Sequence, residues 1–329
     1  MTQAKYVDCH GLTDIGKERE VNEDQFMIAD LSKSILIHQT SLTMDDGSRW
    51  FGGSQGSLML VADGMGGHAG GERASTLAVD RVVLYVLNTM PWFFRLEQQA
   101  ETELKDELTA ALETCQESIQ AESEASPKRA GMGTTLTMAY TLWPRFYVVH
   151  VGDSRCYVLR KSRLKQITTD HTLAQEMVDR GALRPAQAEE SPLSSVLWNT
   201  IGGKSTELTT DVYKGELQVG DTMLLCTDGL TRHVTDDEIT KVLRKAKSAE
   251  EACRTLVNAA NEGGGSDNIT VVAARYREAE PEAAAEATAS VEEKDVLQST
   301  LEATEQQVPQ QVELEAPEAG VAPQATAER

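Results

Sequence analysis

The sequence predicts an α+β fold in which antiparallel sheets pack with helices, and three observations carry that prediction. Short segments rich in Val, Ile, Leu, Thr and Tyr recur along the first 277 residues and have the composition of strands. Four longer stretches place apolar residues at helical spacing. The strands outnumber the helices that could cross between parallel strands, and short turns join many of them, which favours antiparallel pairing over a parallel doubly wound sheet.

The elements can be placed in chain order from these patterns. The strand candidates are residues 5–9, 24–29, 57–62, 134–141, 146–151, 155–159, 221–226 and 268–274. Helical periodicity predicts helices over residues 72–89, 97–122, 236–245 and 249–261. The last helix runs into three consecutive glycines, which is typical of a helix end. Residues 31–55 are a polar insertion that contains Gly and Ser, and we expect an extended hairpin or loop there.

Composition changes near residue 277 and divides the chain in two. Residues 278–329 contain 13 acidic and 2 basic residues and no aromatic residue. Such a segment buries too little apolar surface to offset its ordering entropy, so we predict a disordered acidic tail. A marginal helix over residues 290–306 is the alternative, because that stretch contains good helix formers. Residues 1–277 are predicted to form the folded domain.

The overall charge excludes some classes of partner. With 52 acidic against 31 basic residues, the chain carries a net charge of −21, which argues against nucleic acid or an anionic membrane as its partner. The five cysteines form no C-x-x-C pair, so we expect a reducing compartment rather than a disulfide framework or zinc knuckle. The longest strongly apolar stretch, residues 82–87, is far shorter than the roughly 20 residues of a membrane helix. The start has no apolar signal-peptide core, and we expect a cytoplasmic protein.

Carboxylates stand at the ends of the apolar strand candidates. Asp63 and Asp228 each follow such a strand and precede a glycine, and Asp153 follows a third strand. Asp267 opens the last strand, and the pair Glu23 and Asp24 lies before an early one. Each position alone favours a solvated turn or cap. Together, attached to strands that should be buried, they predict that several carboxylates converge on one edge of a packed sheet.

A convergence of carboxylates has a chemical consequence. Like charges so close raise one another's pKa values unless a cation neutralises them. All-oxygen ligation suits Mg²⁺ or Mn²⁺ rather than zinc. Two such ions about 4 Å apart acidify a bridging water and position it for in-line attack on phosphorus. The pattern therefore predicts phosphoester hydrolysis.

Two neighbouring features agree with a phosphate-binding site. Residues 63–72 read as a strand end, a Gly-rich turn and a helix start, and the glycines allow close backbone approach to a ligand. No Lys follows them, so this is not a nucleotide P-loop. Arg19 precedes the Glu23 and Asp24 pair and could present its guanidinium to a phosphate dianion, although alone it would be interpreted as a surface arginine.

At these residues the sequence resembles the metal-dependent protein phosphatases of type 2C, the PPM family, particularly its compact bacterial members. The motifs occur in the family's order and span nearly all of residues 1–277, with the tail and the 31–55 insertion outside the resemblance. They are R-E-V-N-E-D at 19–24, V-A-D-G-M-G-G-H at 61–68, G-M-G-T-T at 131–135, H-V-G-D-S-R at 150–155, L-C-T-D-G-L at 225–230 and G-S-D-N-I-T-V-V at 265–272.

The resemblance implies a fold and a set of ligands. The fold is a sandwich of two antiparallel sheets flanked by pairs of helices, four layers in all, with the metals at one end. Two Mg²⁺ or Mn²⁺ ions are implied, with a possible weaker third. The position of Asp63 bridges two metals and the carbonyl of Gly64 serves one of them. Asp228 and Asp267 match the ligands of the other metal, and Glu23 and Asp24 match an acidic pair that contributes directly or through water. Asp153 matches a ligand of the third metal. Arg19 matches the arginine that binds phosphate.

One position departs from the eukaryotic pattern and bears on the mechanism. Eukaryotic members often have a histidine, proposed as the general acid, where this chain has Met65. Protonation of the leaving group would then fall to metal-bound water near Asp153, or to His68. The competing interpretation of His68 is a helix-entry residue with no proton role.

Residues 169–203 match the family's variable flap beside the active site. The amphipathic stretch 173–183 is followed by Pro185 and Pro192. Flaps of this kind can select substrates, and the alternative is a passive surface lobe. We expect His171 and Trp198 to be structural.

The sequence thus predicts a Mg²⁺- or Mn²⁺-dependent protein-serine/threonine phosphatase in which water is the nucleophile. We expect a monomer whose partners are phosphorylated proteins, including a serine/threonine kinase of the same cell and its substrates, with no nucleic acid and no membrane insertion. The alternatives are another two-metal phosphoesterase, a pseudophosphatase or phosphoprotein-binding scaffold, and an interaction hub that acts through the acidic tail. A scaffold would have eroded carboxylates, whereas Asp63, Asp153, Asp228 and Asp267 are all present.

Overall fold

The computed structural model describes residues 5–31, 34–36, 49–51, 56–66, 70–88, 98–189, 191–203 and 208–278. All of these residues belong to one compact unit, Gln3–Glu278. The predicted acidic tail lies outside the described residues, except for Glu278 at the end of the last strand. None of the helices in the described ranges combines the length and the apolar character needed to cross a membrane.

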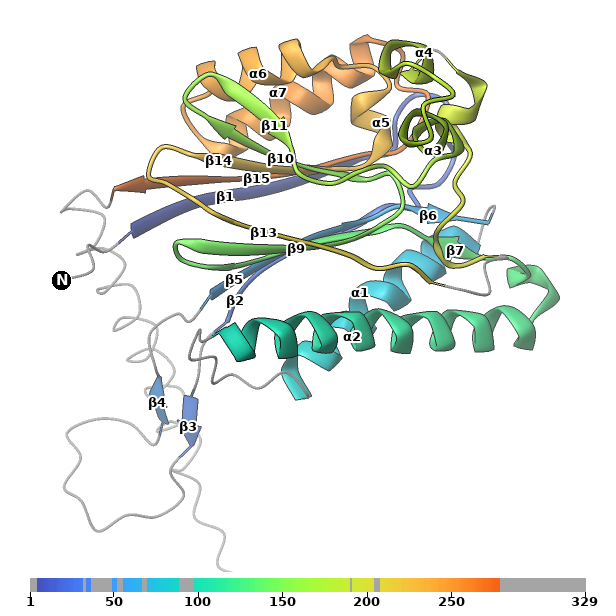
Figure 1. Cartoon of the computed structure of the whole chain (residues 1–329), viewed down its shortest axis with the longest axis horizontal. Coiled ribbons are helices and arrows are strands. Elements are labelled where there is room, and N and C mark those ends of the chain that lie inside the picture. Colours follow the sequence, from blue (N-terminus) through green and yellow to red (C-terminus); the bar gives the residue numbers. More distant parts are fainter. Residues whose placement is uncertain are drawn as a thin grey trace, which may run out of the picture. The chain divides into compact units, whose positions relative to one another are not determined.

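Two five-stranded sheets form the centre of this unit (Figure 1), and every pairing among their described strands is antiparallel. The first sheet has the order β1 (Lys5–Asp14), β15 (Ile269–Glu278), β14 (Thr222–Cys226), β10 (Arg155–Arg160) and β11 (Arg163–Gln166). The second has the order β13 (Asp211–Glu216), β9 (Arg145–Val151), β8 (Leu136–Leu142), β5 (Gly56–Ala62) and β2 (Gln25–Leu31).

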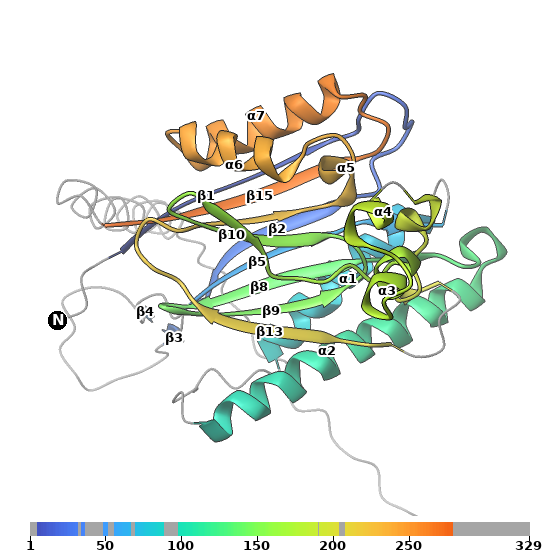
Figure 2. The same cartoon turned by 45° about the horizontal axis from the view of Figure 1, so that its top comes forward.

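Helices cover the outer faces of the two sheets, as Figures 1 and 2 show. The long helices α1 (Gly70–Asn88) and α2 (Gln98–Ala125) pack on the second sheet. On the first sheet lie α5 (Asp228–Thr231), α6 (Asp236–Lys245) and α7 (Ala249–Glu262). The predicted α+β class and the two-sheet sandwich with flanking helices are confirmed.

Alternation along the strands builds three separate cores. In β5, Leu58 and Leu60 point toward α1 and α2, whereas Met59 and Val61 point into the space between the sheets. The same period of two divides β14, where Leu224 belongs to the core under the helices. Each sheet is therefore buried on both faces, which explains why the central strands read as continuous apolar runs in the sequence.

Short elements complete the end of the sandwich that carries the Gly-rich turn. A small sheet has the order β12 (Ile201–Gly202), β7 (Gly133–Thr134) and β6 (Gly64–Met65). Within the 31–55 insertion, β3 (Ser34–Leu36) pairs with β4 (Arg49–Phe51) in an antiparallel hairpin. The flap contains α3 (Leu173–Asp179), α4 (Pro185–Glu189) and the 3₁₀ turn η2 (Pro192–Ser195).

The structure also differs from the strand predictions at particular places. The predicted strand 134–141 is two strands, β7 and β8, because the chain changes sheet at Thr135: β7 pairs with β6 and β12, whereas β8 pairs with β5 and β9. The strands β11 and β13 were not predicted, since both lie at the edge of a sheet and carry polar, partly exposed residues that resemble a loop. The boundaries of α6 were predicted correctly, and its start has a capping box between Thr235 and Glu238.

Candidate active site

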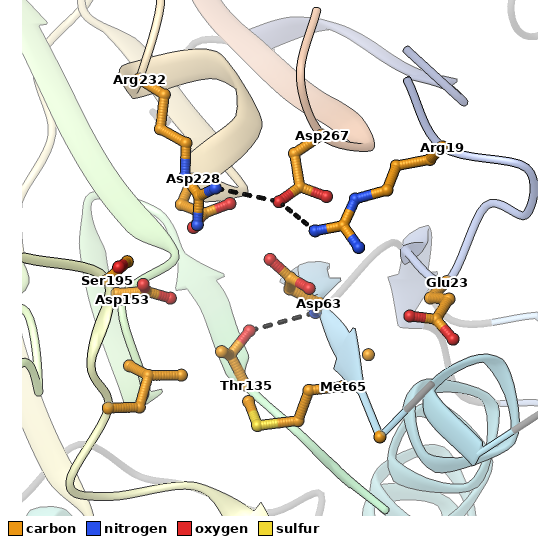
Figure 3. A pocket seen from close by; sticks show the side chains of 13 residues that line it. Arg19, Glu23, Asp63, Met65, Thr135, Asp153, Ser195, Asp228, Arg232 and Asp267 are labelled. Atoms are coloured by element: carbon orange, nitrogen blue, oxygen red, sulfur yellow. Dashed lines mark hydrogen bonds and ion pairs between the residues drawn. The ribbon is translucent and has the colours of Figure 1, made fainter. Parts of the chain in front are cut away.

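The carboxylates identified in the sequence gather around one pocket at the end of the sandwich where β5, β9 and β14 end and β15 begins (Figure 3). Its volume is about 250 Å³. The lining residues come from the strand ends, the Gly-rich turn, the residue after α5 and the flap. They are Arg19, Glu23, Asp63, Gly64, Met65, Gly66, Thr135, Asp153, Ser195, Leu197, Asp228, Arg232 and Asp267.

Three of these carboxylates are in mutual contact range. Asp63, Asp153 and Asp228 each offer an oxygen that lies within 4.8 Å of the others. Burial, followed by the charges of neighbouring carboxylates, raises the pKa of Asp63 and Asp153 well above the ordinary aspartate value. Burial also raises the pKa of Asp228. A bound cation would remove this penalty by giving the ionised oxygens a partner.

The G-M-G-T-T segment positions Asp63. The backbone N–H of Asp63 donates to Thr135 Oγ1 at 3.0 Å, and the Asp63 carbonyl accepts from Thr135 N at 2.9 Å. Thr134 Oγ1 donates to the same carbonyl at 2.8 Å. Three hydrogen bonds therefore fix the backbone at the strand end, so that the side chain of Asp63 is directed into the pocket by residues some 70 positions later in the chain.

The turn that carries Asp153 depends on a glycine and on the same threonine. Gly152 has a φ of +107°, and a Cβ at this position would lie 2.4 Å from Thr135 Cγ2. The next residue but one, Ser154, pairs its hydroxyl with Thr135 Oγ1 at 2.8 Å. Only glycine fits this turn, which places Asp153 beside Asp63.

Asn268 connects the last motif to the first. Its side-chain amide donates to the carbonyls of Ile15 and Val21 at 2.9 and 3.0 Å. Its Oδ1 accepts from the backbone N–H of Glu23 at 2.8 Å. The loop that carries Arg19 and Glu23 is thereby attached to the residue that directly follows Asp267.

The Gly-rich turn packs closely against Glu23. A Cβ on Gly64 would lie 2.2 Å from the carbonyl oxygen of Gly71 and 2.6 Å from that of Glu23. A Cβ on Gly71 would lie 2.7 Å from Glu23 Cδ. A side chain has no room at either glycine, and Gly64 lines the pocket with its backbone. The approach of this backbone to a ligand stays a prediction.

Asp24 lies behind the pocket rather than in its wall. It is 3% exposed, and its Oδ2 accepts hydrogen bonds from Thr227 Oγ1 at 2.9 Å and Thr270 Oγ1 at 2.7 Å. Burial raises the pKa of Asp24 to about 7. This position favours contact with a cation through an intervening water over direct ligation. His68 lies outside the described residues.

Two oxygens in this cluster support the fit to divalent cations. Asp24 Oδ1 and Asp228 Oδ1 are buried and have no hydrogen-bond partner among the described residues. A buried, ionised carboxylate oxygen without a donor is costly, whereas a hard cation is a suitable partner for it. The side-chain donors of the described pocket residues include five carboxylates and no thiolate or imidazole, which suits Mg²⁺ and Mn²⁺.

Positive charge enters the pocket from two arginines. Arg19 Nη2 lies 2.8 Å from Asp267 Oδ2, and half of its side chain is exposed. Arg232 contacts Asp228 and lies 3.1 Å from Asp267 Oδ2. Arg232 was missed in the sequence, although its spacing of four from Asp228 on a short helix was an available signal.

The flap contributes the remaining wall of the pocket. Ser195 and Leu197 line it, and no local pattern in the sequence indicated either of them. Two hydrogen bonds between His171 and Gly152 attach the flap next to Asp153. The backbone N–H of His171 donates to the Gly152 carbonyl at 2.8 Å, and the backbone N–H of Gly152 donates to His171 Nδ1 at 3.1 Å. The ring of Trp198 lies 5.0 Å from that of His171.

With this geometry in place, the chain can be compared with known proteins. It matches the family model described as "Protein phosphatase 2C" over residues 37–270, and it therefore belongs to the protein phosphatase 2C family. The match begins inside the 31–55 insertion, so residues 19–24 lie outside it.

Individual relatives agree with this membership. The chain is 40% identical over 217 residues to "Serine/threonine protein phosphatase PstP" of Mycobacterium tuberculosis, a range that covers 66% of this chain and 40% of that protein. It is 30% identical over 271 residues to "Protein phosphatase PhpP" of Streptococcus pneumoniae, covering 82% and 98%. The chain thus spans only two fifths of the length of the mycobacterial relative.

A solved structure with a similar fold contains two metal ions. The catalytic domain of PstP "in complex with 2 Manganese ions" is similar with a TM-score of 0.63 and 32% identity, covering 83% of this chain and 100% of that one.

Proposed function

We propose that this protein is a Mg²⁺- or Mn²⁺-dependent phosphatase that hydrolyses phosphoserine and phosphothreonine in proteins. The observation that carries the proposal is the convergence of the Asp63, Asp153 and Asp228 oxygens within 4.8 Å of one another, in a pocket that also holds Arg19. Membership of the protein phosphatase 2C family and the two manganese ions bound by a similar structure support it.

The residues would share the work as follows. Asp63, the Gly64 carbonyl, Asp228 and Asp267 would hold two ions between them. Glu23 and Asp24 would contribute directly or through water, and Asp153 would hold a weaker third ion. When bound, the ions supply an acidified water and neutralise charge on the phosphate.

The protein itself orients the substrate. Arg19 extends from an exposed loop over the pocket, where its planar guanidinium can bind two phosphate oxygens. The flap residues Ser195 and Leu197 stand on the opposite wall and would contact the polypeptide next to the phosphorylated residue. The proton donor to the leaving hydroxyl is assigned to the Asp153 side of the site, with His68 as the alternative.

The first test is Asp63→Asn in the full chain. We expect Mn²⁺-dependent hydrolysis of a phosphothreonine peptide to fall by at least about a thousandfold, since the variant loses the bridging charge of the site. Asp106→Asn on the exposed face of α2 is the matched control and should retain wild-type turnover. Circular dichroism establishes that both variants are folded. Retained activity in Asp63→Asn would refute the assignment, and inactive wild-type protein that still binds phosphopeptide would point to a scaffold.

In the cell, we propose a cytoplasmic monomer that opposes a serine/threonine kinase and acts on that kinase and its substrates. The comparison of phosphoproteomes between the wild type and an Asp63→Asn strain tests this directly. Serine and threonine sites whose phosphorylation rises in the variant are the expected result, and an unchanged phosphoproteome would contradict it.

A further inference from the structure

Arg232 is a charged pocket residue to which the proposed function gives no role. It follows α5 directly, four residues after Asp228. Its guanidinium pairs with Asp228 Oδ2 through Nη2, and its Nη1 lies 3.1 Å from Asp267 Oδ2. Figure 3 shows the arginine reaching down between these two carboxylates, which come from different elements.

Donors of the chain already engage three of the four oxygens of Asp228 and Asp267. Asp267 Oδ2 accepts a hydrogen bond from Arg19 and forms an ion pair with Arg232, and Asp267 Oδ1 accepts from the backbone N–H of Asn268 at 2.9 Å. Asp228 Oδ2 accepts a hydrogen bond from Arg232 Nη2, whereas Asp228 Oδ1 has no hydrogen-bond partner among the described residues. A divalent ion that binds Asp228 or Asp267 through Oδ2 must therefore take that oxygen from a guanidinium.

We propose that Arg232 competes with the divalent ion for Asp228 and Asp267 and thereby sets the affinity of that half of the site. The inference rests on the proposed cation site. Two physical effects act in the same direction. An ion that binds through Oδ2 must displace the Arg232 guanidinium, and an ion bound at either carboxylate is repelled by that guanidinium close by. Arg232 has 39% of its side chain exposed, so it can move toward solvent when the ion binds.

The bridging geometry distinguishes this role from a general effect of positive charge. Arg180, on the exposed flap helix α3, pairs with Glu176 and has 74% of its side chain exposed. Removing its charge changes the net charge of the protein by the same amount without touching the pocket. Lysine at position 232 keeps the charge but can contact the two carboxylates only as a single ammonium point.

The experiment measures Mn²⁺ binding rather than turnover. The full chain is freed of divalent ions with EDTA, dialysed, and titrated with Mn²⁺ alone by calorimetry, using wild type, Arg232→Gln, Arg232→Lys and Arg180→Gln. The melting temperature in EDTA is recorded for the same four proteins. We expect Arg232→Gln to lower the Mn²⁺ dissociation constant about tenfold, equivalent to about 1.4 kcal/mol, and to melt at a lower temperature in EDTA.

The other variants complete the test. Arg232→Lys should fall between wild type and Arg232→Gln in both measurements, and it decides the question if Arg232→Gln does not fold. Arg180→Gln should bind Mn²⁺ as wild type does. The proposal is overturned if the Arg232 variants bind Mn²⁺ no more tightly than wild type, or if Arg180→Gln tightens binding equally. If the wild-type protein binds no Mn²⁺, the proposed cation site itself is contradicted, and with it the proposed function.

Discussion

Asn268 joins two distant parts of the active site, and its removal should be costly in a way that can be calculated. The side chain is 5% exposed and makes three hydrogen bonds, to the N–H of Glu23 and to the carbonyls of Ile15 and Val21. A hydrogen bond contributes about 1 kcal/mol net, so Asn268→Ala should lower the free energy of unfolding by about 3 kcal/mol. The loss of unfolding free energy is larger if a backbone group that loses its partner is not reached by water.

The assay is urea unfolding of the full chain in EDTA, followed by fluorescence. Asn258→Ala is the matched control, because Asn258 is exposed on α7 and its replacement should change the unfolding free energy by less than about 0.7 kcal/mol through helix propensity alone. Asn268→Ala should also weaken Mn²⁺ binding, since it frees the loop that carries Arg19 and Glu23. A loss below about 1 kcal/mol would refute the reasoning that this side chain holds the loop.

Three further predictions concern the turn, the acidic cluster and the flap. Gly152→Ala should lower the unfolding free energy by at least about 2 kcal/mol, because its φ is +107° and its Cβ would lie 2.4 Å from Thr135; chemical denaturation with a near-wild-type midpoint would contradict this. In EDTA, the melting temperature should decrease as the pH is raised from about 4 to about 8. Burial raises the pKa of Asp24 from 3.8 to about 7, so the stabilisation by its bound proton is lost as the pH rises through that value. Saturating Mn²⁺ should reverse this trend. Asn199→Ala removes the side-chain donor to His171 Nδ1 at 2.7 Å and to a backbone carbonyl. It should raise KM for a phosphopeptide several-fold more than KM for p-nitrophenyl phosphate. Equal changes in KM for both substrates would argue against a flap that contacts the peptide.

Several parts of the site were predictable because the signal is local. Asp63, Asp153 and Asp228 each follow an apolar strand, and the strand and the turn can both be recognised within a few residues. The helices α6 and α7 were placed for the same reason, since their periodicity and N-caps are local. The edge strands β11 and β13 were missed because half of each faces solvent, so their composition resembles that of loops.

Other features depend on contacts between residues far apart in the chain. The hydrogen bond from Glu23 to Asn268 spans 245 positions, and that between Asp63 and Thr135 spans 72. Ser195 and Leu197 reach the pocket only because the flap is attached beside Asp153. Nothing in the residues around these positions indicates their partners.

By itself the sequence determined the class of fold, the acidic strand ends and the chemistry that such carboxylates can support. Strand periodicity and turn residues act over a few positions, and they are readable without the fold. Only the tertiary structure decided how the charged groups are arranged. It places Asp24 behind the pocket wall, and it pairs Arg232 with two of the carboxylates that a cation would use. Those outcomes follow from the register of the sheets and the packing of the loops on them, which no short segment of the chain encodes alone.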